Sequence, residues 1–349
     1  MALLGCSNSA DVFPSAPQPG SSSSKEGQPG SGARPPPADG GAIPSGQVAG
    51  VASSQDCWNV DISNAPVDWR SNAFIDFINA DSIKRLHPGF GGDMVPGGDE
   101  IWGFPYIVLN GSESRSSVTF EYANQSDGVD HRTGESYPFY PIPDEAIWRP
   151  HLIQGGYPGN VDHRWDNDRH MLLVDRMNKQ LYELDGVYFN QSQWRWEATS
   201  GAFFDLNSND HRPEGWTSAD GSGLAMFPGI LRYEEVYGPD EIDHAVRVTV
   251  RATSGYVYPA SHQAGSTPGA VPMGARLRLK ANTDLSRFSP DAQKIFRALK
   301  KYGLIVVDNG GDMQTSGTYN TRWNNDLLNP AFHQLTASDF EVIELGYRP

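Results

Sequence analysis

Two short segments of the chain alternate strictly between apolar and polar side chains. In 243–251 (DHAVRVTVR) three valines share a face with a histidine, while arginine and threonine side chains lie on the other face. In 274–281 (GARLRLKA) leucine and alanine alternate with arginine and lysine in the same way. Because successive side chains of a strand point to opposite faces, this period of two predicts β-strands with one apolar face. We therefore expect the chain to fold mainly as β-sheet.

Other apolar segments of strand length are bounded by turn-forming residues and predict further strands. These expected strands cover 101–109, 117–122, 170–175, 180–184, 193–197, 202–206, 304–307 and 338–345. The segments 170–175 and 180–184 are close enough to form a hairpin. The segment 87–100 (HPGFGGDMVPGGDE) is rich in glycine and proline and is expected to be a long loop.

Two segments have the apolar spacing of helices, 71–83 and 290–302. In the expected helix 290–302, Ser289 can cap the N-terminus and Pro290 suits the first turn. Gly303 suits the position that directly follows the C-terminus of the helix. Together these elements predict a mainly β fold. The architectures that fit are an antiparallel β-sandwich, a jelly roll or an irregular barrel with about two short helices.

The first 55 residues differ in composition from the rest of the chain. Glycine, proline and serine make up 28 of these 55 residues, and Phe13 is the only aromatic residue among them. Such a segment cannot bury enough apolar surface to offset the entropy lost on ordering. We expect residues 1–55 to be a disordered tether and residues 56–349 to be a single β-rich globular domain.

The run Leu3-Leu4-Gly5-Cys6 resembles a bacterial lipobox, in which a small residue precedes a cysteine that becomes lipidated. The resemblance covers these residues alone, since the two residues before them supply no basic or apolar leader. It implies an exported protein at the outer membrane, on the cell surface or outside the cell; the alternative is an ordinary linker. The second cysteine, Cys57, is expected to be buried and inert.

The formal net charge is −15, and nearly all of it belongs to residues 56–349. This acidity argues against a nucleic-acid-binding protein, because neutralising phosphates requires a basic surface. Two cysteines cannot build a disulfide scaffold or a four-thiolate zinc site. No run of 18 apolar residues is present, so no segment is expected to span a membrane as a helix. We expect a monomer whose membrane contact is limited to a lipid anchor at Cys6.

Carboxylates, amides and an aromatic ring are concentrated in 203–236. Asp205 and Asp308 each follow an apolar run, and Asp220 lies in a loop rich in glycine and serine. Loops carried by a rigid sheet often hold sites, and a glycosidase needs two carboxylates. We expect these three aspartates to be catalytic, with Asp220 and Asp308 as acid/base or nucleophile and Asp205 orienting them. In this hydrolase Arg212, Arg247 and His170 bind substrate, and Trp216 stacks on a sugar ring. The alternative role of each aspartate is a hydrogen bond within a turn.

The spacing of Asp205, Asn207 and Asn209 is similar to the start of a calcium-binding loop. However, Asp210 and Trp216 stand where that loop needs glycine and glutamate. The histidines also lack a compact zinc-binding spacing. We therefore expect no cofactor and no metal site, with a structural calcium ion left open as an alternative.

Basic side chains on the strand faces offer a second route to glycan chemistry. Arginine can bind the carboxylates of an anionic glycan, and histidine with tyrosine can supply the acid and base for β-elimination from a uronic acid. The candidate substrate-binding residues of such a site are Arg169, His170, Tyr233, Arg247, His262 and Arg276. The alternative is a solvated sheet face with arginine–carboxylate pairs.

The segments WTSAD…RYEEV, DHAVRVTV and GARLRLKA resemble a family of exported bacterial proteins, and a tether before an aromatic-rich β domain is similar to secreted carbohydrate-active proteins. These resemblances imply no particular catalytic residue. We expect a polysaccharide or oligosaccharide as the partner and a glycoside hydrolase that uses paired carboxylates. The alternatives are a polysaccharide lyase and a non-catalytic glycan-binding or cell-envelope module.

Overall fold

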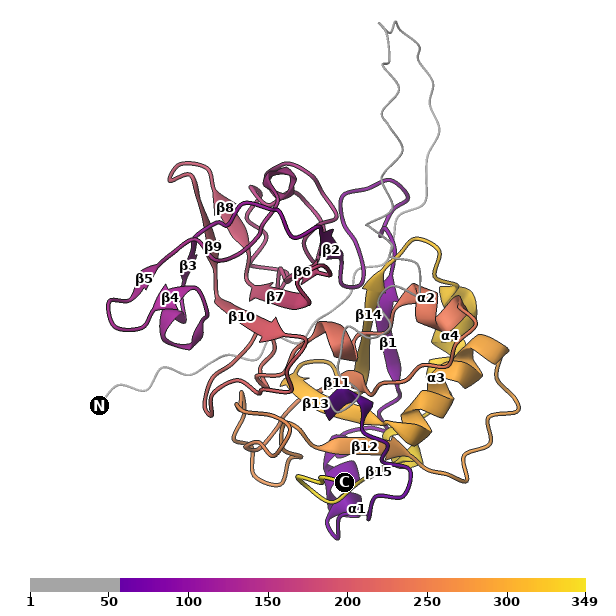
Figure 1. Cartoon of the computed structure of the whole chain (residues 1–349). Helices are drawn as coiled ribbons and strands as arrows, with labels where there is room; N and C mark the ends of the chain where they lie inside the picture. The colour runs from indigo at the N-terminus through magenta and orange to yellow at the C-terminus, as the bar shows by residue number, and fades with distance from the viewer. Residues whose placement is uncertain (1–56) are drawn as a thin grey trace, which may run out of the picture. The chain divides into compact units, whose positions relative to one another are not determined.

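The structure is a computed structural model that describes residues 57–349 (Figure 1). The expected tether and the lipobox-like start therefore lie outside the described residues. Cys57 is buried, as the sequence predicts. Among residues 57–349, no helix combines the length and apolarity that crossing a membrane requires.

The largest sheet has six strands in the order β1-β14-β11-β13-β12-β15. Its strands are β1 (His87–Gly91), β11 (Val246–Val250), β12 (Arg276–Leu279), β13 (Leu304–Asn309), β14 (Gln314–Tyr319) and β15 (Phe340–Val342). The pairings β1–β14 and β11–β13 are parallel, and the remaining pairings are antiparallel. Strands β11 and β13 lie in the middle of the sheet and are mostly buried. Residues 304–307 of β13 form a continuous apolar run, which is typical of a strand buried on both faces.

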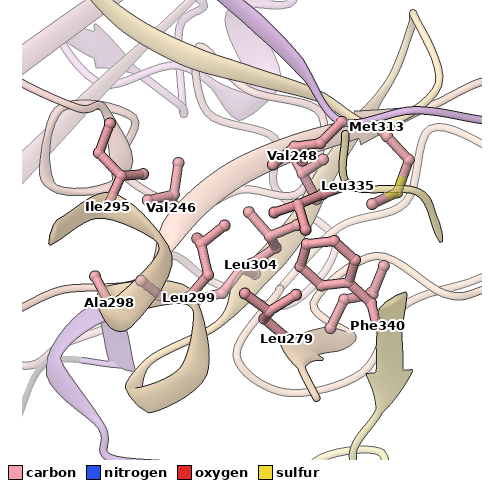
Figure 2. Packing of buried hydrophobic residues seen from close by; sticks show 14 of the residues in the cluster. Val246, Val248, Leu279, Ile295, Ala298, Leu299, Leu304, Met313, Leu335 and Phe340 are labelled. Carbon is pink, nitrogen blue, oxygen red and sulfur yellow. The ribbon is translucent and has the colours of Figure 1, made fainter. Parts of the chain in front are cut away.

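Helices cover this sheet. The α-helices are α1 (Ser71–Ile78), α2 (Tyr233–Tyr237), α3 (Pro290–Lys301) and α4 (Asn325–Phe332). Helix α3 packs against β12, α4 against β1 and α1 against β15. Ile295 and Leu299 of α3 belong to the same buried core as Val246, Val248 and Leu304 (Figure 2). Burying one such side chain stabilises the fold by about 1.5–3 kcal/mol.

The remaining strands form smaller sheets with the orders β10-β7-β6-β2, β3-β9-β8 and β4-β5. Their bounds are β2 (Tyr106–Leu109), β3 (Val118–Phe120), β4 (Val129–Asp130), β5 (Glu135–Ser136), β6 (Met171–Asp175), β7 (Gln180–Asp185), β8 (Tyr188–Asn190), β9 (Arg195–Ala198) and β10 (Ser200–Asp205). Short 3-10 helices are η2 (Cys57–Asn59), η3 (Ala123–Gln125), η4 (Asp144–Ile147), η5 (Phe227–Gly229) and η6 (Ala337–Asp339). The four-stranded and three-stranded sheets share one apolar cluster, and the four-stranded sheet contributes alternate residues, such as Leu172 and Val174, to a second cluster.

The expected mainly β fold is confirmed. The sheets are mixed, however, because four strand pairs are parallel, and no sheet of residues 57–349 closes into a barrel. The described region also holds four α-helices where about two were expected. The β6–β7 hairpin forms as predicted. Helix α3 begins as predicted too, with the Ser289 side chain accepting a hydrogen bond from the backbone N–H of Ala292 at 3.4 Å.

The expectation of a loop over 87–100 is wrong at its start, because residues 87–91 form strand β1. Pro88 has no backbone N–H to donate. It is tolerated there because β1 lies at the edge of the sheet, where one side of the strand has no neighbouring strand to accept a hydrogen bond. Gly89 is needed for a close approach to β14, because a Cβ atom at this position would lie 2.6 Å from the Thr315 carbonyl oxygen. Residues that usually form turns therefore serve here as a tightly packed edge strand.

Candidate functional site

A cleft of about 960 Å³ lies between residues of the six-stranded sheet and residues of the β10-β7-β6-β2 sheet. Arg247 of β11 and Asp308 of β13 line it from the first sheet, and Asp185 of β7 lines it from the second. The segment 217–221, which follows β10 in the chain, also contributes to the lining. The cleft is therefore assembled from parts of the chain that are far apart in sequence.

The loop around Asp220 is held from both sides. On one side the Gly221 N–H donates to Asp308 Oδ2 at 2.9 Å. On the other, His170 Nε2 lies 2.7 Å from the carbonyl oxygen of Ala219. Within the loop, the Asp220 N–H donates to the Ser218 hydroxyl at 2.9 Å. Because its contacts come from two sheets, the loop has a fixed position in the cleft.

Asp220 and Arg247 form a buried ion pair. Arg247 Nε donates to Asp220 Oδ2 at 3.0 Å and Nη2 donates to Oδ1 at 2.7 Å, so the contact is bidentate. The third guanidinium nitrogen donates to the hydroxyl of Ser316 on β14. Asp220 is 1% exposed and Arg247 is 5% exposed. This desolvated, two-point contact fixes both side chains at the base of the cleft.

A bulge at the end of β13 brings Asp308 to the cleft. Val306 pairs with Val248, but the next pair joins Asp308 to Thr249, so Val307 is the extra residue. Without this extra residue, Asp308 would share the face of Val306, which packs in the core. With it, Asp308 lies beside Thr249, on the face that also carries Arg247.

The surroundings of Asp308 favour its protonated form. Burial, followed by the nearby charge of Asp220, raises the pKa of Asp308 to about 6. Hydrogen bonds from the backbone N–H groups of Gly221 and Asn309, together with the charge of Arg247, oppose this rise. The result is a carboxyl group that exchanges a proton in mildly acidic solution, which is the property required of a general acid.

The facing wall pairs a histidine with a second carboxyl group. His170 is buried, its Nε2 lies 3.5 Å from Asp185 Oδ1, and its Nδ1 contacts the side-chain oxygen of Gln154. Burial raises the pKa of Asp185; the charge of His170 opposes the rise, while those of Asp168 and Asp220 add to it. Two carboxyl groups in this cleft, Asp185 and Asp308, thus have raised pKa values.

Five of the candidate residues from the sequence line this cleft. They are His170, Asp220, Arg247, His262 and Asp308. His262 lies at its rim, with Nδ1 2.8 Å from the carbonyl oxygen of Gly221. The expected meeting of Asp220 and Asp308 is therefore present in the structure.

The structure does not bring the other six candidates to the cleft lining. Exposed Asp205 accepts two hydrogen bonds from Asn207 in a turn, as the alternative interpretation stated. The remaining five contact other parts of the protein. Arg169 donates to the carbonyls of Gly156 and Pro158, Arg276 donates to the Cys57 carbonyl, and Arg212 forms an ion pair with Asp127. The rings of Trp216 and Tyr233 pack on His131 and Trp323, respectively. Arg212 still supports the site, since it donates to carbonyls of Gln125 and Thr217 beside the cleft.

The sequence also contained a signal for Asp185 that we did not use. Asp185 ends a mostly buried strand, as Asp308 does, and the position of a carboxylate at the end of a strand is the pattern that led us to Asp308. Asp168 precedes the buried Arg169-His170 pair and lines the same wall. Within residues 57–349, no three histidine, cysteine, aspartate or glutamate side chains are grouped as a metal ion would require.

Gly221→Ala is expected to displace the Asp308 carboxyl group and raise its pKa further. A Cβ atom at this position would lie 2.6 Å from Asp308 Oδ1, so the carboxyl group must move and lose its hydrogen bond from the Gly221 N–H. Because that hydrogen bond lowers the pKa of Asp308, its loss should raise the pKa, with a change of about 1 kcal/mol in the free energy of unfolding. An NMR titration of the Asp308 carboxyl group and urea unfolding measure the two effects. An unchanged pKa would contradict the role of the Gly221 N–H.

The free energy of unfolding is expected to be largest near pH 4. Burial raises the pKa of Glu183 to about 7 and that of Asp308 to about 6, so the folded protein binds these protons more tightly than the unfolded chain. Stability therefore falls as the pH rises from about 4 through these values, by about 3 kcal/mol for each group, since one pKa unit corresponds to about 1.4 kcal/mol. Urea unfolding between about pH 4 and pH 8 measures this slope, which Glu183→Gln should reduce. A rise in stability over that interval would contradict the assignment.

At the acid end, a different carboxyl group limits stability. Burial raises the pKa of Glu235, but the charges of Arg232 and His244 and a hydrogen bond from His244 outweigh it and hold this pKa at about 2. This lowered pKa stabilises the fold above the group's ordinary value near 4.5, and the contribution is lost as the pH falls towards 2.

Comparison of the chain with models of protein families, with curated proteins and with solved structures finds no match. The site therefore has to be interpreted from its own geometry.

Proposed function

We propose that the protein is a glycoside hydrolase and that the cleft between the two sheets is its active site. The observation that carries the proposal is the environment of Asp308, where burial and the charge of Asp220 raise the pKa to about 6. Glycoside hydrolysis needs one carboxylic acid that protonates the leaving oxygen and a second carboxylate that assists attack on the sugar. Burial raises the pKa of both Asp308 and Asp185, but the largest charge effect differs: Asp220 raises the pKa of Asp308, whereas His170 lowers that of Asp185. This difference supports such a division of roles.

In this proposal Asp308 is the proton donor. Asp185 is the second carboxylate, since its side chain is 25% exposed on the facing wall, whereas Asp220 is almost fully buried and held by Arg247. We assign Asp220 a positioning role: its charge raises the pKa of Asp308, and its loop holds the Gly221 N–H against that carboxyl group. His170 orients Asp185 through the 3.5 Å contact.

The charges of the cleft favour hydrolysis over β-elimination. Arg247 is the only lysine or arginine among the described residues that line the cleft, and Asp220 already occupies its guanidinium group. A lyase acting on a uronic acid needs a cation that neutralises the substrate carboxylate, and the described lining offers no second arginine or lysine for this role.

A panel of soluble neutral, anionic and amine-bearing glycans tests the proposal. We expect new reducing ends from at least one glycan at mildly acidic pH, without the ultraviolet absorbance of an unsaturated uronide. Absorbing products would instead identify a lyase. Glycan binding without turnover across the whole panel would indicate a non-catalytic module.

Asp220→Asn is expected to move the pH dependence of the reaction to lower pH. The substitution removes the charge that raises the pKa of Asp308 and leaves the opposing charge of Arg247 unbalanced, so both effects lower this pKa. The descending limb of kcat/KM, which lies near pH 6 in the wild type, should shift down by about one pH unit. Circular dichroism identifies the temperatures at which the variant stays folded. An unchanged limb would contradict the positioning role of Asp220.

A further inference from the structure

The described lining of the cleft is strongly acidic. Six carboxyl groups line it, from Glu100, Asp166, Asp168, Asp185, Asp220 and Asp308, against the single guanidinium group of Arg247. Arg247 neutralises Asp220 in the bidentate ion pair, and burial raises the pKa values of Asp185 and Asp308, so the acidity of the lining rests mainly on Glu100, Asp166 and Asp168. Such a cleft concentrates cations and repels anions, because its walls focus the field of charges of one sign.

The acidic groups have positions from which they can meet a ligand. Glu100 and Asp168 are exposed to solvent at the cleft, in contrast to buried Asp220. The raised pKa of Asp185, caused first by burial, includes contributions from the charges of Asp168 and Asp220. Neighbouring carboxylates in this cleft therefore repel one another, and a positively charged ligand would relieve that repulsion.

Two aromatic rings add a second requirement on the ligand. Trp102 and Tyr122 line the same cleft and are 55% and 47% exposed. An exposed ring in a cleft offers a stacking surface to a sugar, and its face also attracts a cation. A ligand that combines sugar rings with positive charge satisfies both the aromatic and the acidic parts of the lining.

We propose that the cleft takes a glycan that carries protonated amines, such as an oligomer of glucosamine. The inference rests on the proposed glycoside hydrolase function and specifies its substrate class. Glu100 and Asp168 bind the amines, and Trp102 or Tyr122 packs on the sugar rings. A bound divalent cation is a poorer occupant, because the described residues offer no grouping of three ligands for one.

Calorimetric titration of the full chain carrying Asp308→Asn tests this substrate class, since the substitution limits turnover. The ligands are hexamers of glucosamine, of N-acetylglucosamine and of galacturonic acid, at about pH 5.5 and at low and high salt. We expect the glucosamine hexamer to bind at least about tenfold more tightly than the acetylated one, with the preference decreasing at high salt. Glu100→Gln and Asp168→Asn should each weaken glucosamine binding about three- to tenfold and leave the acetylated ligand unaffected.

Asp240→Asn is the matched control, because Asp240 is exposed and is not among the described lining residues. It should leave all three affinities unchanged. Equal or tighter binding of the acetylated or galacturonate hexamer would overturn the substrate class, as would a preference insensitive to Glu100→Gln and Asp168→Asn.

Failure of the substrate class and failure of the proposed enzyme give different results. Hydrolysis of neutral glycans without a preference for amines overturns the substrate class and leaves the hydrolase in place. Amine-dependent binding that responds to Glu100→Gln, with no glycan hydrolysed by the wild type, supports the ligand class and overturns the hydrolase.

Discussion

Asp308→Asn is expected to lower kcat by about 10²- to 10⁴-fold, the usual contribution of a general acid. Asparagine keeps the size of the side chain and an oxygen that can accept from the Gly221 N–H, but it has no proton to give to a leaving oxygen. Steady-state kinetics on the best substrate of the glycan panel measure the loss. The expected result is a fall in kcat that persists at every pH tested.

The same substitution should not destabilise the fold at neutral pH. Burial raises the pKa of Asp308 to about 6, so the folded state favours the protonated group and its ionisation above that pH costs stability. The neutral amide removes this cost, which should make the variant up to about 3 kcal/mol more stable than wild type near pH 7.5. The gain should shrink as the pH falls to about 4 and vanish near pH 3, below the ordinary pKa of about 3.8, where the wild-type carboxyl group is protonated in both states.

Asp205→Asn provides the comparison for this experiment. Asp205 also follows an apolar strand, but it is exposed and its carboxylate serves a turn. We expect this variant to keep activity within twofold of wild type. Equal losses in the two variants, or full activity in Asp308→Asn, would contradict the assignment of Asp308.

Arg247→Met is expected to cause the largest loss of stability, about 3–5 kcal/mol in the free energy of unfolding. Methionine fills much of the space but leaves Asp220 as a buried carboxylate without its two hydrogen bonds from the guanidinium group. An unpaired charge in such surroundings is more costly than the loss of a well-solvated pair. Urea unfolding near neutral pH measures the effect.

The double variant Arg247→Met with Asp220→Asn separates charge from packing. Because the neutral amide removes the uncompensated charge, the double variant should recover at least about half of the stability lost by Arg247→Met. A loss below about 1 kcal/mol in the single variant would show that the ion pair does not stabilise the folded protein. A double variant no better than the single one would assign the loss to packing.

Local patterns in the sequence predicted the strands and helix that carry much of the site. The alternation in 243–251 predicted that Arg247 lies opposite the valines of β11, and the apolar run before Asp308 predicted its strand. The cap at Ser289 and the hairpin of β6 and β7 are also local features. Each depends on residues close in sequence, which is why single-segment reasoning identified them.

The parts that escaped prediction depend on contacts between distant segments. The bulge at Val307 arises from the register between β11 and β13, and alternation alone would place Asp308 on the core face. His170 and Asp220 meet through the Ala219 carbonyl, across 49 residues of sequence. The basic faces expected to bind a glycan are instead partly buried, with Arg278 donating to carbonyls of the 62–65 segment.

The most direct measurement compares reducing-end release by wild type and Asp308→Asn on the same glycan panel between about pH 4 and pH 8. The account predicts release by the wild type at mildly acidic pH, a decline as the pH passes about 6, and at least about a hundredfold lower rate in the variant. No release from any glycan, or a variant as active as wild type, would contradict it.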